Sequence, residues 1–287
     1  MELVARGLVA SREQAQGAIA SGQVVVAGAP AGKANRMVAA SEPIRLCGPP
    51  PRYVSRGGEK LEAALDHFGL DIRGRRCLDA GASTGGFTDC LLQRGASSVL
   101  ALDVGRGQLH ERLREDRRVT SAERTNLRDA RLADLGGVPY EVVVADLSFI
   151  SLRTVAPVLL GELAAPEAEV VVLVKPQFEA GNLDGGRAEV SRGRGVIRDP
   201  AIWLGTLRGV IAAFEACGGH ATGVVASPLT GAQGNVEFLL HCRAPGDLPL
   251  GEAWLDLDAA IAEGAALAGL SSETSPASGA GLTGERA

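Results

Sequence analysis

One stretch of the sequence is the strongest indication of the fold: Cys77-Leu78-Asp79-Ala80-Gly81-Ala82-Ser83-Thr84-Gly85-Gly86-Phe87-Thr88. Two residues typical of a strand lead into an acid, a glycine-rich turn follows, and a helix is predicted to begin at Gly86. Glycine permits backbone angles that other residues avoid and lets a ligand approach the main chain closely. The stretch therefore predicts a strand–turn–helix junction of an α/β protein, as an ordinary tight turn or as a binding loop.

The spacing within this stretch narrows the choice of ligand. Its glycines do not follow the GxGxxG pattern, which disfavours a dinucleotide. An acid directly before the turn suits a ligand that bears an ammonium group, and S-adenosylmethionine (SAM) fits that description. The residues that we expect to bind this cofactor here are Asp79, Gly81, Ser83, Thr84, Gly85, Gly86 and Phe87.

Strands and helices are predicted to alternate from residue 76 to residue 243, which favours a mainly parallel sheet. The fold class is thus α/β, a Rossmann-like sheet with helices on both faces. After the first strand, the buried strands are expected at 98–103, 118–121, 141–146 and 169–174, followed by an antiparallel edge at 223–227 and 235–241.

Ionisable residues stand where these strands end. In open α/β sheets, ligands bind at the carboxyl ends of the strands, and Asp79, Asp103, Asp146 and Lys175 all fall there. An acid after the second strand typically accepts the hydroxyl groups of a ribose. We therefore add Asp103, and Asn126 beyond the third strand, to the expected cofactor site.

Charge is distributed unevenly along the chain. The formal net charge is −5 over 287 residues. Residues 1–60 hold eight lysines and arginines against four acids, a net of +4, whereas residues 244–287 hold one arginine against seven acids, a net of −6. A basic front segment is typical of nucleic-acid binding. The tail, residues 244–287, is expected to be largely disordered, with a short helix at 254–267 and disorder beyond residue 271.

Residues 1–46 are predicted to form a small α+β unit. We expect a helix from Ser11 to Ala20, a strand at 24–26 and a closing strand at 44–46. The unit resembles the RNA-binding module named after ribosomal protein S-four, whose pattern is met by Leu3, Gly7, Leu8, Ser11, Arg12, Ala15, Ile19, Gly22, Val24, Val26 and Gly28. Its basic residues would contact phosphates, although charge alone also allows a solvated surface.

Cysteine usage and hydropathy bear on location. The five cysteines are scattered and form no CxxC pair, which argues against a zinc site or a disulfide framework and for the reducing cytoplasm. No apolar run approaches the ~20 residues needed to span a bilayer. The N-terminus does not have the pattern of a secretory signal.

A linker is expected at 47–58, where three consecutive prolines favour an extended spacer. A helix is predicted to begin at Glu59, with Lys60 in its first turn, and to open a domain that covers residues 59–243. Residues 178–199, with several arginines among glycines, are expected to form a long loop that could close over a polyanion.

Five segments in order resemble the TlyA family, in which an S-four-type module precedes an FtsJ-like methyltransferase domain. These segments lie at 55–61, 78–88, 146–152, 174–179 and 234–238. The resemblance implies a catalytic tetrad at Lys60, Asp146, Lys175 and Glu237. It also implies cytidine 2′-O-methylation of ribosomal RNA in ribosomal subunits, no metal, and RNA contacts at Arg6, Ser11, Arg12, Lys33, Arg36, Arg56, Arg187, Arg192 and Arg194.

The chemistry of these residues agrees with that implication. A lysine can act as a general base only when neutral, which burial and a neighbouring cation favour. Lys175 is the expected base, Lys60 the neighbouring cation, and Asp146 and Glu237 the carboxylates that orient the two amines. The alternatives are an RNA-binding protein without catalysis and a membrane-active hemolysin, the name that some family members carry. A monomer is compatible with the sequence.

Overall fold

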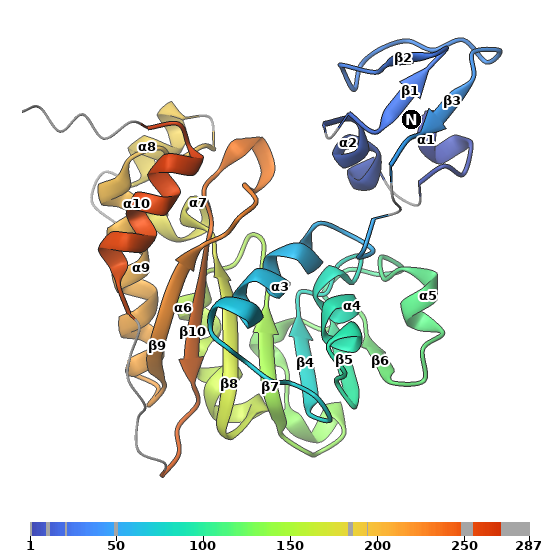
Figure 1. The fold of residues 1–287 in the computed structure, drawn as a ribbon. Coiled ribbons are helices and arrows are strands. Elements are labelled where there is room, and N and C mark those ends of the chain that lie inside the picture. The colour runs from blue at the N-terminus through green and yellow to red at the C-terminus, as the bar shows by residue number, and fades with distance from the viewer. Residues whose placement is uncertain are drawn as a thin grey trace, which may run out of the picture.

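The computed structural model describes residues 2–9, 12–20, 22–48, 51–182, 186–193, 195–247 and 255–270. The described chain forms a small N-terminal unit and a larger α/β domain, joined by the segment that follows β3 (Figure 1). The expected residues Ser11 and Arg194, and the disorder expected beyond residue 271, lie outside this description.

The small unit has two helices beside a three-stranded antiparallel sheet of order β2-β1-β3. Left-handed backbone angles at Ala27 and Gly28 turn the chain between β1 and β2, as a tight hairpin requires. The expected helix and both expected strands are present, and a minimal strand, β2, is added. The elements are α1 (Glu2–Ala5), α2 (Arg12–Ala20), β1 (Val24–Val26), β2 (Ala29–Pro30) and β3 (Ile44–Leu46).

A seven-stranded sheet of order β6-β5-β4-β7-β8-β10-β9 forms the centre of the larger domain. The first five strands in that order are parallel, and β10 runs antiparallel between β8 and β9. The predicted α/β class and the predicted antiparallel edge are both confirmed. The strands are β4 (Arg76–Ala80), β5 (Ser98–Leu102), β6 (Val119–Ala122), β7 (Tyr140–Ala145), β8 (Ala164–Val174), β9 (His220–Ala226) and β10 (Phe238–Arg243).

Helices cover both faces because alternate strand residues point to opposite sides. In β7, Val142 and Val144 join one core with α3, α4 and α5, whereas Val143 and Ala145 join the other with α6, η3 and α9. The short helices η1 and η2 follow β6. The helices are α3 (Gly57–His67), α4 (Gly86–Gln93), α5 (Glu111–Arg114), η1 (Leu127–Asp129), η2 (Leu132–Leu135), α6 (Leu152–Val158), η3 (Leu159–Leu163) and α9 (Pro200–Glu215).

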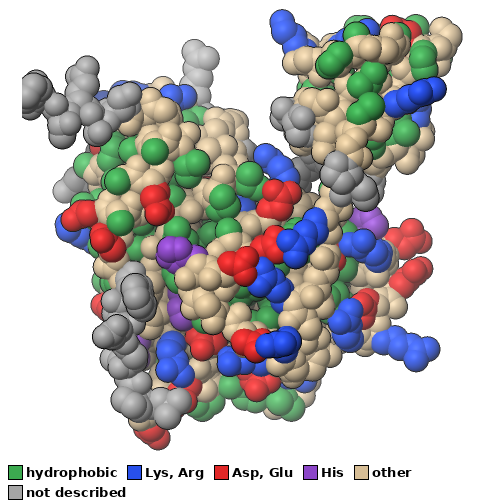
Figure 2. Space-filling model, viewed as in Figure 1, with side chains coloured by type: hydrophobic (Ala, Val, Ile, Leu, Met, Phe, Trp, Pro, Cys, Tyr) green, Lys and Arg blue, Asp and Glu red, His purple; other side chains and the backbone are tan. Residues whose placement is uncertain are grey.

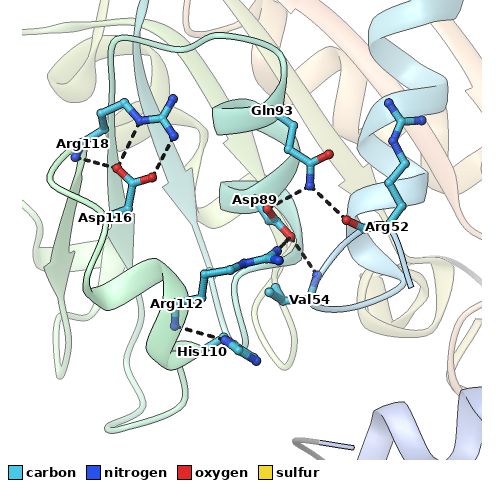
Figure 3. A network of polar contacts seen from close by, with 8 residues as sticks. All are labelled: Arg52, Val54, Asp89, Gln93, His110, Arg112, Asp116 and Arg118. Carbon is cyan, nitrogen blue, oxygen red and sulfur yellow. Dashed lines mark hydrogen bonds and ion pairs between the residues drawn. The ribbon is translucent and has the colours of Figure 1, made fainter. Parts of the chain in front are cut away.

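The second half of the expected linker belongs to the larger domain. Helix α3 begins at Gly57, two residues before the predicted start, and Tyr53 and Val54 are buried. A side chain at Gly58 would collide with the ring of Tyr53, so this glycine lets the linker pack against the helix. Asp89 of α4 accepts the backbone N–H of Val54 at 2.8 Å (Figure 3).

The prediction of a long loop at 178–199 is wrong, because the described part of this segment is largely helical. It contains the end of α7 (Pro176–Glu179), η4 (Ala180–Asn182) and α8 (Gly186–Arg192). Proline is favoured in the first turn of a helix, and Pro176 opens α7 directly after Lys175. A side chain at Gly186 would collide with Ala180. This glycine therefore allows α8 to pack closely against η4 and is not a sign of a flexible loop.

The expected tail is also partly ordered. Helix α10 (Leu257–Leu267) lies against β9 and α9, close to the predicted 254–267. Ala260 is buried, and Gly264 packs so closely against Val236 that an added Cβ would lie 2.9 Å from it. Glu263 accepts the N–H of Ala226 at 3.2 Å. The helix predicted within the acidic tail is therefore present, and its apolar face packs on the core.

Candidate active site

The glycine turn places the main chain of the larger domain at the carboxyl edge of the sheet. Gly81 has φ +85°, and a Cβ there would lie 2.5 Å from the carbonyl oxygen of Asp146. Gly85 is the N-cap of α4 and adopts the left-handed conformation, with φ +96°. These angles are strained for residues with side chains, so both positions require glycine.

Two adjoining cavities open at this edge. The larger, about 530 Å³, lies beside Asp103 and Asn126, and the smaller, about 200 Å³, lies beside Lys60 and Lys175. Both are lined by Gly81, Ser83, Asp146 and Ser148, so they form one continuous site. Of the residues expected at the cofactor, the cavities are lined by Gly81, Ser83, Thr84, Gly86, Phe87, Asp103 and Asn126.

Asp79 lies behind the turn and lines neither of these cavities. It is fully buried, and one carboxylate oxygen accepts the N–H of Thr88 at 2.8 Å and its hydroxyl at 2.6 Å. Burial raises the pKa of Asp79 from 3.8 to about 7. Its other oxygen is buried without a hydrogen-bond partner in the described part of the chain. Asp79 thus anchors the first turn of α4 and keeps one acceptor free.

Asp103 orders the loop on the other side of the larger cavity. One of its oxygens accepts the N–H of Ser83 at 2.7 Å and the other accepts the N–H of Gly105 at 2.6 Å. Each carboxylate oxygen has a second lone pair, so the group can also accept hydroxyl donors from the cavity. Asn126 caps η1 by accepting the N–H of Arg128 at 3.1 Å, which leaves its amide donor available.

The four expected catalytic residues form two lysine–carboxylate pairs. Lys60 donates to Glu237 at 2.5 Å, and both are buried, with exposed fractions of 8% and 2%. Lys175 pairs with Asp146 and lies 3.3 Å from the hydroxyl of Ser148. Lys60, Lys175 and Asp146 line the same 200 Å³ cavity. The structure thus brings all four residues together, with two amines at one small polar space.

Glu237 owes its position to its neighbours in the chain. Val236 and Phe238 both lie against Gly264 of α10, while Glu237 points the other way, to Lys60. A side chain at Gly231 would collide with the carboxylate of Glu237, so the glycine makes room for it.

Two aromatic residues at this edge, Phe149 and Phe178, had no predicted role. Phe149 is 91% exposed, has a left-handed φ of +65°, and lines the larger cavity three residues after Asp146. Its ring centroid lies 5.2 Å from that of Phe178, whose own centroid lies 6.0 Å from the amine of Lys175. The only signal in the sequence was that both residues belong to segments carrying a catalytic residue.

The basic residues of the small unit that are expected to bind RNA differ in how far the protein itself already holds their side chains. The guanidinium of Arg6 bonds to Glu2 and to the carbonyl oxygens of Ala39, Ala40 and Glu42, and so holds the loop before β3. The remaining expected residues of the unit are Lys33, which is exposed, Arg36, which lies 3.6 Å from Glu42, and Arg12, whose side chain is outside the description.

The other arginines expected to bind RNA lie on the larger domain. Arg56 lines the 200 Å³ cavity beside Lys60. Arg192 is exposed at the end of α8, and the side chain of Arg187 is outside the description. Basic and acidic side chains alternate on the face of this domain seen in Figure 2. Among the expected RNA contacts whose side chains the structure describes, Arg56 is the one that lines the cavity of the two lysines.

The fold and the site define a class before any comparison. The sheet has β10 antiparallel between β8 and β9, a glycine turn after β4, and acids at the carboxyl ends of β4, β5 and β7. These features describe a Rossmann-like methyltransferase domain. The profile of the FtsJ-like methyltransferase family matches residues 53–244. The chain belongs to this family, and within it to the TlyA proteins.

Relatives of known sequence or structure agree with this assignment. The chain is 46% identical, over 92% of its own length and 96% of the relative's, to the 16S/23S rRNA (cytidine-2′-O)-methyltransferase TlyA of Mycobacterium tuberculosis. A solved structure described as a hemolysin from Streptococcus thermophilus is 38% identical, with a TM-score of 0.71 over 93% of each chain. A second such structure, from Lactococcus lactis, is 43% identical, with a TM-score of 0.68 over 74% of this chain and 98% of the other. Among the described residues, no helix has the length and apolar character needed to cross a membrane.

Proposed function

We propose that this protein transfers the methyl group of SAM to the 2′-hydroxyl of a ribose, that of a cytidine, in ribosomal RNA. The observation that carries the proposal is the pair of lysine amines, each held by its own carboxylate, at a cavity that adjoins the glycine turn. The likeness to an enzyme named for this reaction supports the nucleotide and the substrate. Ribosomes would place the reaction in the cytoplasm.

The larger cavity has the features that SAM requires. Asp103 would accept the ribose hydroxyls, and the exposed main chain at Gly81 would lie against the amino-acid portion. Asp79, buried behind the turn, would support this site by holding the first turn of α4 through Thr88. When bound, SAM supplies a methyl carbon made electrophilic by its attachment to a positively charged sulfur.

Lys175 is assigned the proton transfer. Its amine, when neutral, would take the proton of the 2′-hydroxyl while the hydroxyl oxygen forms its bond to the methyl carbon and the carbon–sulfur bond breaks, leaving its electrons on sulfur. Asp146 and Ser148 would hold the amine in place. Lys60, at the same cavity, would bring a second amine to the reacting atoms.

The substrate side of the proposal rests on RNA chemistry. A 2′-hydroxyl distinguishes RNA from DNA, and enzymes that act on a nucleotide within a duplex usually extrude it from the stack. Phe149 is the exposed aromatic side chain at the site on which an extruded base would stack. Arg56 beside the cavity, and Lys33 and Arg36 on the small unit, would contact phosphates.

Methyl transfer to isolated ribosomal subunits tests the proposal. Purified small and large subunits lacking the modification are incubated with the protein and SAM bearing a tritiated methyl group. We expect label in RNA, at a linkage that resists alkali because the 2′-oxygen is blocked. The labelled subunit identifies the substrate.

The Lys175→Ala variant is the control for this experiment. It should bind SAM nearly as the wild-type protein does and transfer no label, because only the base is removed. Turnover like that of the wild-type protein in this variant would overturn the assignment of Lys175. Absence of label on either subunit, with SAM still bound, would favour the alternative of an rRNA-binding protein without catalysis.

A further inference from the structure

One buried carboxylate near the site has no part in the proposed mechanism. Glu179, at the end of α7, is only 1% exposed. One of its oxygens accepts the backbone N–H of Leu152 at 2.6 Å, and the other accepts the hydroxyl of Ser151 at 2.6 Å. Burial raises the pKa of Glu179, and these two bonds oppose that effect. A carboxylate is rarely placed in such an environment unless its partners compensate for the lost hydration.

These bonds join the two segments that carry the Lys175–Asp146 pair. Lys175 is the N-cap of α7, so Glu179 lies one helical turn behind it. Ser151 is the N-cap of α6 and ends the segment 146–151, which begins with Asp146. The segments therefore meet twice, at Lys175 with Asp146 on the side of the cavity and at Glu179 with Ser151 on the buried side.

The segment 146–151 needs such support because its conformation is unfavourable by itself. Phe149 adopts a left-handed backbone angle although it has a bulky side chain, and its ring is almost fully exposed. Residues in this conformation persist only where the surrounding structure fixes them. Glu179 fixes the chain two and three residues after Phe149.

Capping of α6 alone does not explain Glu179. The hydroxyl of Ser151 already accepts the N–H of Arg153 at 3.2 Å, which is the ordinary side-chain cap of a helix. The two hydrogen bonds to Glu179 are additional to this cap. They come from α7, which follows β8, whereas Ser151 and α6 follow β7. Arg153 lies 3.7 Å from Glu179 and provides a nearby positive charge.

We propose that Glu179 is a positioning residue that fixes the segment carrying Asp146, Ser148 and Phe149 against the segment carrying Lys175 and Phe178. The inference rests on the proposed function, because it concerns the geometry of the same reacting pair. Misplacement of a reacting group by about 1 Å can lower a rate by about 10²-fold. Loss of the clamp should therefore reduce the rate of the chemical step more than the affinity for either substrate.

Two substitutions of Glu179 test this inference. Glu179→Ala should lower kcat for methyl transfer by about 10- to 100-fold, while the Kd for SAM and the KM for the ribosomal subunit stay within about threefold. Glu179→Gln should retain kcat within about threefold, because its carbonyl oxygen can accept the N–H of Leu152 and its amide can donate to the hydroxyl of Ser151. Ser151→Ala, which removes one bond and a small group, should give an intermediate kcat even if Glu179→Ala does not fold.

Glu169→Ala is the matched control. Glu169 is another largely buried carboxylate and lies 2.7 Å from the Nε2 atom of His241. It lies on β8, six residues and about 20 Å before Lys175, which directly follows this strand. This variant should lower the melting temperature and leave kcat per folded molecule unchanged. A Glu179→Ala variant that behaves in the same way, or that keeps the wild-type kcat, would overturn the inference.

Hydrogen exchange separates this inference from the proposed function. The amide of Leu152 should be protected in the wild-type protein and in Glu179→Gln, and should exchange much faster in Glu179→Ala, whether or not methyl transfer occurs. An inactive wild-type protein with this pattern would refute the proposed function alone. Unchanged protection in Glu179→Ala would refute the clamp alone.

Discussion

The two lysine–carboxylate pairs have the same chemistry but different surroundings. The side chains of Lys60 and Glu237 are 11% and 2% exposed, and those of Lys175 and Asp146 are 12% and 25% exposed. Asp146 lines both cavities, whereas Glu237 lines neither. The two lysines are almost equally exposed and line the same cavity, so the pairs differ in their carboxylates. We call Lys60–Glu237 the sealed pair, which is suited to holding charge and shape, and Lys175–Asp146 the open pair, which is suited to reacting. This difference assigns separate roles to residues that the sequence alone presents as equivalent.

Loss of Lys175 should have the largest effect on activity. General bases typically contribute 10²- to 10⁴-fold to a rate, so Lys175→Ala should lower kcat by about 10³-fold or more. Its stability should change little, because water can reach Asp146 once the amine is gone. Single-turnover methyl transfer and thermal unfolding provide the two measurements. A large loss of stability with a modest loss of rate would reverse the roles of the two pairs.

Loss of Lys60 should instead destabilise the protein. Removal of one partner from a buried ion pair typically costs about 3–5 kcal/mol, because the remaining charge stays buried without compensation. Lys60→Ala would leave Glu237 in that state. Urea denaturation should show the loss, and a stability equal to that of the wild-type protein would contradict the sealed character of this pair.

A double variant separates stability from function at the same site. Replacement of both members of a buried ion pair by apolar residues is often neutral or stabilising. Lys60→Met combined with Glu237→Leu should therefore recover most of the free energy of unfolding lost in Lys60→Ala. It should not recover methyl transfer, since the second amine would still be missing. Recovered activity would show that this pair serves the fold alone.

Asp79 differs from the carboxylates of the two pairs because it is buried without a cation beside it. Its pKa rises from 3.8 to about 7 on folding, so between about pH 4 and pH 7 the folded state holds a proton that the unfolded state has lost. The contribution of this group to stability therefore falls as pH rises through that window, by about 1.4 kcal/mol per unit and up to about 4 kcal/mol in total.

Asp79→Asn should remove this pH dependence, because an amide does not ionise. The free energy of unfolding, measured with urea at several pH values from 4.5 to 7.5, should fall less steeply with pH in the variant than in the wild-type protein. Parallel curves for the two proteins would show that Asp79 does not titrate in this range.

Phe149, beside the open pair, should give the smallest of these effects. Stacking of a base on an aromatic side chain is worth about 1–3 kcal/mol, so Phe149→Ala should raise the KM for the ribosomal subunit by about 10- to 100-fold. The Kd for SAM should stay near the wild-type value. Val138→Ala, at another exposed apolar residue outside the two cavities, is the control and should change neither constant. An unchanged KM in Phe149→Ala would remove the stacking role.

The parallel sheet was predictable because its strands are buried on both faces. Runs such as Val142-Val143-Val144 read as strands without periodicity, and Asp79, Asp103, Asp146 and Lys175 at the ends of four runs mark the carboxyl edge. The four expected catalytic residues came from resemblance and from their places at strand ends and in the first turn of a helix. Their meeting at one cavity follows from the sheet order, in which β7 and β8 are neighbours.

The errors have a common physical source. At Gly58 and Gly186, which fell in the expected linker and in the expected loop, glycine instead allows close packing against Tyr53 and Ala180. Such contacts leave no local pattern in the sequence. For the same reason Glu179 had no predicted role, since its partners are 27 and 28 residues away.

The buried half of the linker limits how far the small unit can reach. Only six residues lie between Leu46 at the end of β3 and Tyr53, which is packed under α3. Fully extended, such a connection spans roughly 25 Å. This length limits the distance in space between the small unit and the cavity. Under the proposed function, an RNA that contacts both must hold the phosphate on the small unit and the ribose in the cavity within that reach.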